Sequence, residues 1–164
     1  MKTKRLLAMF TALLMILCLA ACGDGGSANK YTYEGVSLAL PEGFTVDENS
    51  ATPIAYGPNY PDNTDNITFS YSGADSIDNY SQEVFETNYS ALLGEVTSNS
   101  FEKVKVGGKD AIEYNYSLSV NGVEMEQTQV MVFLSDKTVT VTFTSASGEY
   151  DSAFAQAIDS ISAK

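Results

Sequence analysis

The sequence has no histidine, no tryptophan and only two cysteines among its 164 residues, and its 9 basic residues are far outnumbered by 21 acidic ones. The absence of histidine excludes Ser-His-Asp and Cys-His catalytic arrangements, a histidine general base and every histidine metal ligand. The scarcity of Lys and Arg, with a formal net charge of −12, argues against nucleic-acid binding, because that needs clustered basic side chains to displace counterions from phosphates. Hydrophobic residues nevertheless make up 44% of the chain, enough for the packed core of one domain.

The N-terminal residues have the pattern of a secretory signal. A short basic segment, Met1–Arg5, precedes an apolar run, Leu6–Leu17, in which Thr11 is the only polar residue. Even when it is extended to Ala21, this run is shorter than the roughly 20 residues that a membrane-spanning helix needs. The pattern therefore predicts a signal peptide over residues 1–21 that is removed from the mature protein.

The residues after this run, Leu19-Ala20-Ala21-Cys22 followed by a glycine, resemble the lipobox of bacterial lipoproteins. The resemblance implies cleavage before Cys22 and a diacylglycerol on its sulfur. The alternative is an uncleaved N-terminal anchor that contains an incidental cysteine. The other cysteine, Cys18, lies within the signal peptide and would leave with it, so we expect no disulfide in the mature domain.

The predicted mature protein is strongly acidic. Loss of Lys2, Lys4 and Arg5 leaves 6 basic residues against 21 acidic ones, a formal charge of −15. An anionic membrane surface repels such a domain, so attachment must depend on the lipid, whose two acyl chains are enough for stable anchoring. Residues 22–30 comprise Cys22 and a short flexible tether. The expected location is the bacterial cell membrane, with the domain on the extracytoplasmic side.

The remaining residues, 31–164, predict a single α+β domain, an antiparallel sheet with one helix in mid-chain and one at the C-terminus. Helical periodicity extends over Ser76–Leu93, with Gly94 placed to end the helix, and over Gly148–Ile161. Alternating apolar residues and turn signals predict strands at Tyr31–Tyr33, Val36–Leu40, Phe44–Val46, Ile54–Tyr56, Ile67–Tyr71, Val96–Val106, Ala111–Val120, Val123–Leu134 and Thr138–Thr144.

Two tight turns and one apolar segment constrain the sheet. Glu34-Gly35 suggests a hairpin near the start of the domain, and Asn121-Gly122 is a strong signal for a two-residue β-hairpin. Residues 130–134 are apolar on both faces of their predicted strand. Other residues must therefore cover this segment on both sides.

Two short segments resemble the ends of PsbP-like domains. Gly35-Val36-Ser37-Leu38-Ala39-Leu40-Pro41-Glu42-Gly43-Phe44 looks like their opening hairpin, and Phe154-x-x-x-Ile158-x-Ser160-Ile161 resembles their closing helix. With the order of the elements, the resemblance covers residues 31–164. It implies an α/β/α sandwich whose relatives mostly act as assembly or accessory proteins. Some relatives bind metal through histidine, and since this chain has no histidine, no metal site is carried over.

The longest segment without helix or strand periodicity, Asn49–Asn66, is the candidate interaction site. Long loops in compact domains are usually functional or disordered, and the three prolines of this loop favour stiffness. Tyr56 and Tyr60 offer contact area, because rings on a rigid loop lose little entropy on binding, and Asp62 and Asp65 would form a charged rim. The alternatives are that the rings fold back over the core, or that the loop shields a sheet edge.

Two other acidic groups have possible chemistry, but a solvated surface is the better interpretation of each. Glu124 and Glu126 share one face of a predicted strand, a spacing that suits acid–base catalysis only if burial raises one pKa. Residues 62–66 offer oxygen ligands for a cation such as Ca²⁺, but they lack the acidic spacing and the glycine of an EF-hand loop. We predict no metal site, no cofactor and no enzymatic activity.

The sequence favours a membrane-anchored extracytoplasmic lipoprotein that acts as a non-catalytic accessory or interaction module. Its expected partners are the membrane, through Cys22, and another extracytoplasmic or membrane protein. An alternative is a lipoprotein that binds a small ligand or cation and serves a membrane transporter, although the chain is far smaller than two-lobed solute receptors. A third is a hydrolase that uses carboxylates alone. A pocket with convergent polar groups would favour the second, and a buried carboxylate pair the third.

Overall fold

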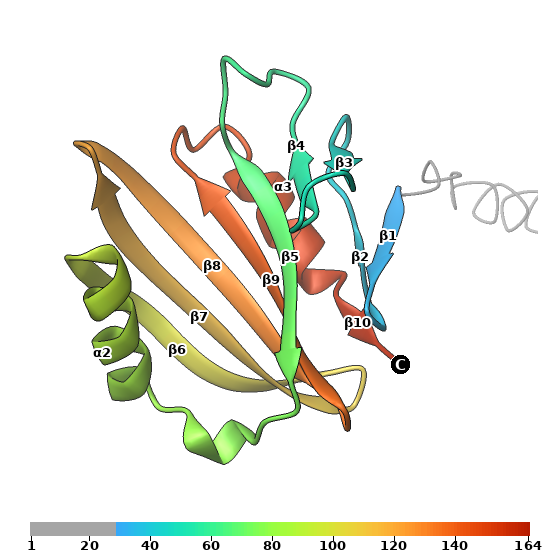
Figure 1. The fold of residues 1–164 in the computed structure, drawn as a ribbon. Coiled ribbons are helices and arrows are strands. Elements are labelled where there is room, and N and C mark those ends of the chain that lie inside the picture. The colour runs from blue at the N-terminus through green and yellow to red at the C-terminus, as the bar shows by residue number, and fades with distance from the viewer. Residues whose placement is uncertain (1–28) are drawn as a thin grey trace, which may run out of the picture.

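The computed structural model describes residues 29–164, so the predicted signal peptide, Cys22 and most of the predicted tether lie outside the described residues. The described chain forms three layers (Figure 1). A seven-stranded antiparallel sheet is the middle layer. The helix α2 (Gln82–Leu93) lies against one of its faces, and α3 (Asp151–Asp159) with a three-stranded sheet lies against the other. This is the α+β class, and the α/β/α sandwich, expected from the sequence.

The large sheet has the strand order β3-β4-β5-β9-β8-β7-β6, and all its neighbouring strands are antiparallel. Its strands are β3 (Thr45–Asp47), β4 (Ile54–Tyr56), β5 (Asn66–Gly73), β6 (Val96–Val106), β7 (Lys109–Val120), β8 (Val123–Phe133) and β9 (Lys137–Ser145). The Asn121-Gly122 hairpin is confirmed, because Val120 pairs with Val123 and the two turn residues have φ of 55° and 82°.

The small sheet contains β1 (Lys30–Tyr33), β2 (Val36–Ala39) and β10 (Ser162–Ala163), with β2 in the centre. The β1–β2 hairpin turns at Glu34-Gly35, as predicted. Lys30 already belongs to β1, so the strand begins one residue before the predicted domain boundary. The sequence does not predict β10, because two residues are too few to show an alternation.

The mid-chain helical segment differs from the prediction. Instead of one helix over residues 76–93, the chain forms a 3₁₀ turn, η1 (Ile77–Asn79), followed by α2. Ser81 starts α2 because its hydroxyl accepts a hydrogen bond from the backbone N–H of Val84 at 3.3 Å. Gly94 ends α2 with a φ of 89°, as predicted. Within residues 29–164, the helices are too short or too polar to cross a membrane.

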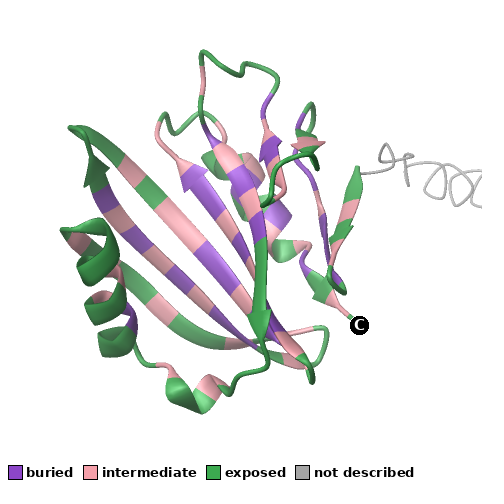
Figure 2. Cartoon of the chain, in the orientation of Figure 1, coloured by how far each residue is buried: buried purple, intermediate pink, exposed green. Residues whose placement is uncertain are grey.

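Two apolar clusters form the core, one on each face of the large sheet. Figure 2 shows buried residues alternating with less buried ones along β7 and β9. The cluster beneath α3 and the small sheet contains Val130 and Val132, and the cluster beneath α2 contains Phe133. The prediction that residues 130–134 are covered on both sides is therefore confirmed.

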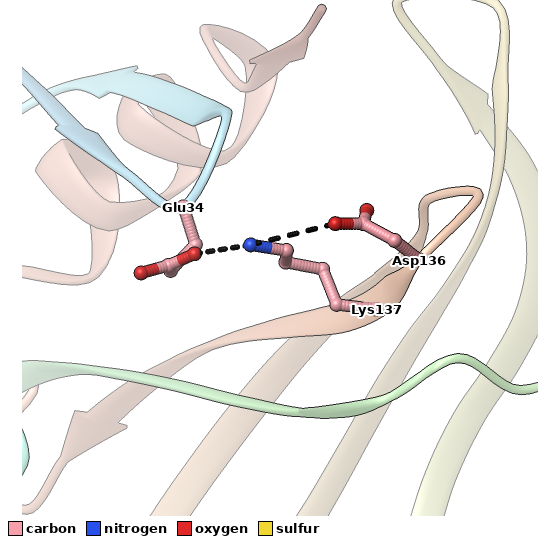
Figure 3. A network of polar contacts seen from close by, with 3 residues as sticks. All are labelled: Glu34, Asp136 and Lys137. Atoms are coloured by element: carbon pink, nitrogen blue, oxygen red, sulfur yellow. Dashed lines mark hydrogen bonds and ion pairs between the residues drawn. The ribbon is translucent and has the colours of Figure 1, made fainter.

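An ion pair joins the small sheet to the large one (Figure 3). The Nζ atom of Lys137, at the start of β9, lies 2.5 Å from Oε2 of Glu34 and 3.8 Å from Oδ2 of Asp136. The hydrogen bond with Glu34 raises the pKa of Lys137 above its ordinary value. The contact holds the β1–β2 turn next to the β8–β9 turn.

Candidate functional site

The loop Asn49–Asn66 is fixed at its middle by β4, which pairs with β5. Tyr56 is the last residue of β4 and is half-buried, whereas Tyr60 lies in the following turn and is 51% exposed. The two rings are stacked, with centroids 4.1 Å apart and an angle of 29° between their planes. The structure thus brings the two predicted tyrosines together as one surface feature.

The two acidic residues of the predicted rim have different environments. Asp62 is exposed, but Asp65 is only 1% exposed. Oδ1 of Asp65 accepts hydrogen bonds from the backbone N–H groups of Ala146 and Ser147, at 2.8 and 3.1 Å, and Oδ2 accepts one from the Ser147 hydroxyl at 2.6 Å. The expectation that Asp65 lies on an exposed rim is wrong, because its carboxylate binds the turn after β9. A binding role for Tyr56, Tyr60 and Asp62 stays a prediction.

Two asparagines hold the loop against the same turn. Nδ2 of Asn59 donates to Oε1 of Glu149 at 2.9 Å, and Nδ2 of Asn63 donates to Oε2 of Glu149 at 2.6 Å and to the Ser147 hydroxyl at 3.0 Å. The sequence does not single out these residues, because their partners follow more than 80 positions later. These bonds and those of Asp65 fix the loop relative to β9.

A shallow hollow of about 640 Å³ lies between the loop and the turn after β9. Its lining residues are Pro58, Asn59, Tyr60, Asp62, Asn63, Thr64, Asp65, Ala146, Ser147 and Glu149. Amide, hydroxyl and carboxylate groups therefore surround one exposed aromatic ring. Such a lining can hold a polar group by hydrogen bonds, and it contains neither a cysteine nor a histidine that could act as a nucleophile or base.

The other acidic candidates lack the features that their chemistry needs. Glu124 and Glu126 on β8 are both exposed, so the burial that acid–base catalysis requires is missing at this pair. Within residues 29–164, no group of three or more Asp, Glu or Cys residues is arranged to hold a metal ion. In the segment 62–66, the possible cation site, both carboxylate oxygens of Asp65 are already engaged as acceptors of hydrogen bonds from the protein.

A second groove, of about 330 Å³, lies between α3 and the large sheet. Its lining includes Phe143, Phe154 and four carboxyl groups, those of Glu113, Glu126, Asp151 and Asp159. Burial raises the pKa of Glu113, and the carboxylates of Glu102 and Asp159 raise it further. Glu113 is therefore protonated more readily than an exposed carboxyl.

On the opposite face of the sheet, tyrosines and glutamines connect α2 to β7 and β8. The Tyr89 hydroxyl donates to Gln129, and the Tyr116 hydroxyl donates to Gln127. Nε2 of Gln129 donates in turn to the Tyr116 hydroxyl at 3.2 Å. Burial raises the pKa of both tyrosines, so their hydroxyls stay protonated near neutral pH and act as donors.

Comparison with known proteins finds solved structures of similar fold at low sequence identity. No family model and no curated protein matches the chain. The solution structure of cyanobacterial PsbP (CyanoP) from Synechocystis superposes with a TM-score of 0.60 and 18% identity, over 89% of this chain and 99% of that one. LpqN, a protein involved in cell envelope biogenesis of Mycobacterium tuberculosis, gives a TM-score of 0.58 and 15% identity, over 85% of this chain and 86% of that one.

A third neighbour, from Bacteroides thetaiotaomicron, has a TM-score of 0.52 and 16% identity, over 82% of this chain but only 48% of its own. At these identities the likeness shows the fold alone. The chain therefore has a PsbP-like fold, as the two terminal segments predict. The lipobox and the anchor at Cys22 stay predictions.

Proposed function

We propose that this protein is a lipid-anchored extracytoplasmic module, without catalytic activity, that recognises a partner protein through the Asn49–Asn66 loop. The stacked pair of Tyr56 and Tyr60 carries this proposal, because the loop that bears it is fixed to the turn after β9 by hydrogen bonds. Rigid rings supply contact area at a low cost in conformational entropy. The exposed Asp62 lies on the same hollow as Tyr60 and contributes charge to this surface.

The location rests on the lipobox-like residues that end at Cys22. It is supported by the fold, since LpqN, which has a similar fold, is involved in cell envelope biogenesis. The absence of histidine and the exposure of Glu124 and Glu126 support a binding role rather than a catalytic one.

The polar hollow beside Tyr60 favours a second candidate function. Its amide and carboxylate groups suit a small polar ligand or a cation, which a membrane-anchored protein can pass to a transporter. In that case Asp62 and Glu149 would contact the ligand, and the protein would bind it without any partner protein.

Crosslinking in intact bacterial cells, followed by membrane fractionation, tests the proposal. The chains compared are the wild type, Tyr60→Ala, Tyr71→Ala and Cys22→Ser. We expect the wild type to be found in the membrane fraction with a crosslinked protein, and Tyr60→Ala to remain there but lose most of that product. Tyr71→Ala is the matched control, because Tyr71 is similarly exposed, at 59%, but lies on β5 outside the loop. Cys22→Ser should be secreted or remain an unprocessed precursor.

Each outcome bears on a separate part of the proposal. Membrane retention of a normally processed Cys22→Ser protein contradicts the lipid anchor. Equal crosslinking by Tyr60→Ala and the wild type contradicts recognition through the loop. Thermal denaturation of Tyr60→Ala checks the fold, because loss of one ring of a stacked pair should cost no more than about 1.5 kcal/mol. A loss of about 3–5 kcal/mol would instead mean that the ring belongs to the core.

A further inference from the structure

One face of the large sheet is only partly covered by a helix. On this face α2 packs on β6 and β7, where Phe85 contacts the rings of Tyr114 and Phe101. Figure 1 shows α2 at one side of the sheet, whereas the same face of β5, β9 and part of β8 has no helix over it. Thr68, Thr140, Thr142 and Gln127 lie in these uncovered strands and are half-exposed.

The register of the strands shows which side chains share this face, because residues directly opposite each other in an antiparallel pair point the same way. One row across β4, β5, β9, β8 and β7 is Tyr56, Asn66, Thr144, Gln127 and Tyr116. The next row is Ile54, Thr68, Thr142, Gln129 and Tyr114. Further along, Ser70 lies opposite Thr140. We call these positions on β5, β9 and β8 the hydroxyl–amide face.

The hydroxyl–amide face carries no charged side chain, although the chain has 21 acidic residues. In typical soluble domains about 25% of all residues are charged. On the same face of β6, at the edge of the sheet, Lys103 and Lys105 are charged. Depletion of charge, together with retained aromatic residues, is the compositional mark of a binding surface.

Hydrogen bonds hold the amides of this face in fixed orientations. Gln127 accepts from the Tyr116 hydroxyl, and its Nε2 donates to Oγ1 of Thr144 at 3.0 Å. Gln129 is held between Tyr89 and Tyr116. Gln129 and Thr144 are each only 8% exposed, so the accessible groups are mainly those of Thr68, Thr140, Thr142 and Gln127. These groups are neutral, lie on strands about 4.8 Å apart, and the threonine hydroxyls can each donate and accept.

We propose that the hydroxyl–amide face binds an uncharged glycan strand of the cell wall. Anionic polymers find no Lys or Arg there, cationic ones find no carboxylate, and an apolar chain would desolvate the hydroxyls without replacing their hydrogen bonds. Sugar hydroxyls both donate and accept, as threonine hydroxyls and glutamine amides do. The half-exposed ring of Tyr89, at the end of the face next to α2, can pack against the apolar side of a sugar ring.

The choice of the cell wall as the source of the glycan rests on the proposed extracytoplasmic location, but the binding surface itself does not depend on the anchor or on Tyr60. The test therefore uses the purified full chain in mild detergent, whether or not Cys22 is lipidated. Co-sedimentation is measured with cell-wall sacculi, which their peptide crosslinks keep insoluble, and with insoluble chitin, an uncharged N-acetylglucosamine polymer that carries no peptide. Soluble N-acetylglucosamine hexamer is the competitor, and polyglutamate is the anionic control.

The decisive variant is Thr68→Val with Thr142→Val, which removes two hydroxyls that lie opposite each other while keeping β-branched side chains of similar shape. We expect the wild type to sediment with both the sacculi and the chitin, and the double variant to bind each of them about tenfold or more weakly. Thr142→Ser, which keeps a hydroxyl, should retain most of the binding. Thr97→Val is the matched control on β6, because Thr97 is exposed and pairs with Ser117, which lies on the other face.

Three results would overturn the proposal: no binding of the wild type to chitin, competition by polyglutamate but not by the hexamer, or equal binding by the double variant and the wild type. Binding to sacculi but not to chitin would also contradict it, since it would assign the surface to recognition of the wall peptides. Tyr60→Ala separates this site from the loop, because it should lose the crosslinked partner but keep the glycan.

Discussion

At the scale of single residues, Glu113 is the carboxyl whose ionisation works against folding. It lies directly opposite Glu102 in the β6–β7 pair, and burial with the charges of Glu102 and Asp159 raises its pKa above the ordinary value of 4.5. A carboxyl whose pKa is higher in the folded than in the unfolded chain stabilises the fold while it is protonated. This contribution is lost as the pH rises through the folded-state pKa.

We therefore expect Glu113→Gln to be more stable than the wild type at pH 7, by about 0.2–1 kcal/mol, since it removes one member of a like-charged cross-strand pair. The gain should shrink as the pH is lowered towards 4, because Glu113 of the wild type then takes up its proton. Urea denaturation at several pH values measures the difference. Glu124→Gln is the control, because Glu124 is exposed and lies opposite Ser119. A gain at Glu113 that is the same at every pH would contradict this explanation.

Asp62 and Asp65 show what the sequence can and cannot tell about a site. Both belong to the same polar loop, so pattern alone predicts an exposed rim for both. Only the fold brings Ala146 and Ser147 beside Asp65, and these residues convert one carboxylate into a buried hydrogen-bond acceptor. The stacking of Tyr56 on Tyr60 is likewise a product of the turn between them.

At the scale of elements, the Asn121-Gly122 turn gives a direct test. Gly122 has a φ of 82°, and no atom lies within 4 Å of the position that a Cβ would occupy. Gly122→Ala should therefore cost about 1–2 kcal/mol through backbone strain alone. Gly73→Ala is the control, since Gly73 has equally open space and no left-handed backbone. The measurement is the denaturation midpoint of each variant, and we expect that of Gly122→Ala to be the lower one. Equal midpoints would mean that backbone strain at this turn is negligible.

Elements with strong local signals are predicted well from the sequence. The strands β6 to β9 and the hairpin at Asn121-Gly122 follow from alternation and turn residues, which act within a few positions. The sequence does not predict the break between η1 and α2, because Tyr80 continues the apolar stripe. Ser81 nevertheless caps a new helix, since its hydroxyl accepts a hydrogen bond from the backbone N–H of Val84. The sequence does not predict β10, because its pairing depends on β2 at the other end of the chain.

At the scale of the whole molecule, Gly107 controls how closely the two sheets approach. A Cβ on Gly107 would lie 2.5 Å from the carbonyl oxygen of Ala163 in β10 and 2.8 Å from its nitrogen. Gly107→Ala must therefore displace β10 as well as strain the turn. Gly108→Ala should cause similar backbone strain, because Gly108 has a φ of 82°, but a Cβ at this position would have no atom within 4 Å.

We expect Gly107→Ala to be less stable than Gly108→Ala by about 1–3 kcal/mol, the usual range for an overpacked contact. Chemical denaturation gives the two free energies of unfolding. Hydrogen exchange at Val36 and Ala163 should accelerate only in the Gly107 variant, since these two residues lie opposite each other in the small sheet. Equal stabilities of the two variants would show that β10 moves aside without cost.

The pairing of β2 with β10 also sets the order in which the chain can finish folding. β2 belongs to the first hairpin of the described residues, whereas its partners Ser162 and Ala163 come much later in the chain and emerge long after it. Such a contact has one of the longest sequence separations that the fold allows, and closing it carries the largest loop entropy. Until β10 has been synthesised, β2 has an open strand edge on which a second nascent chain can pair.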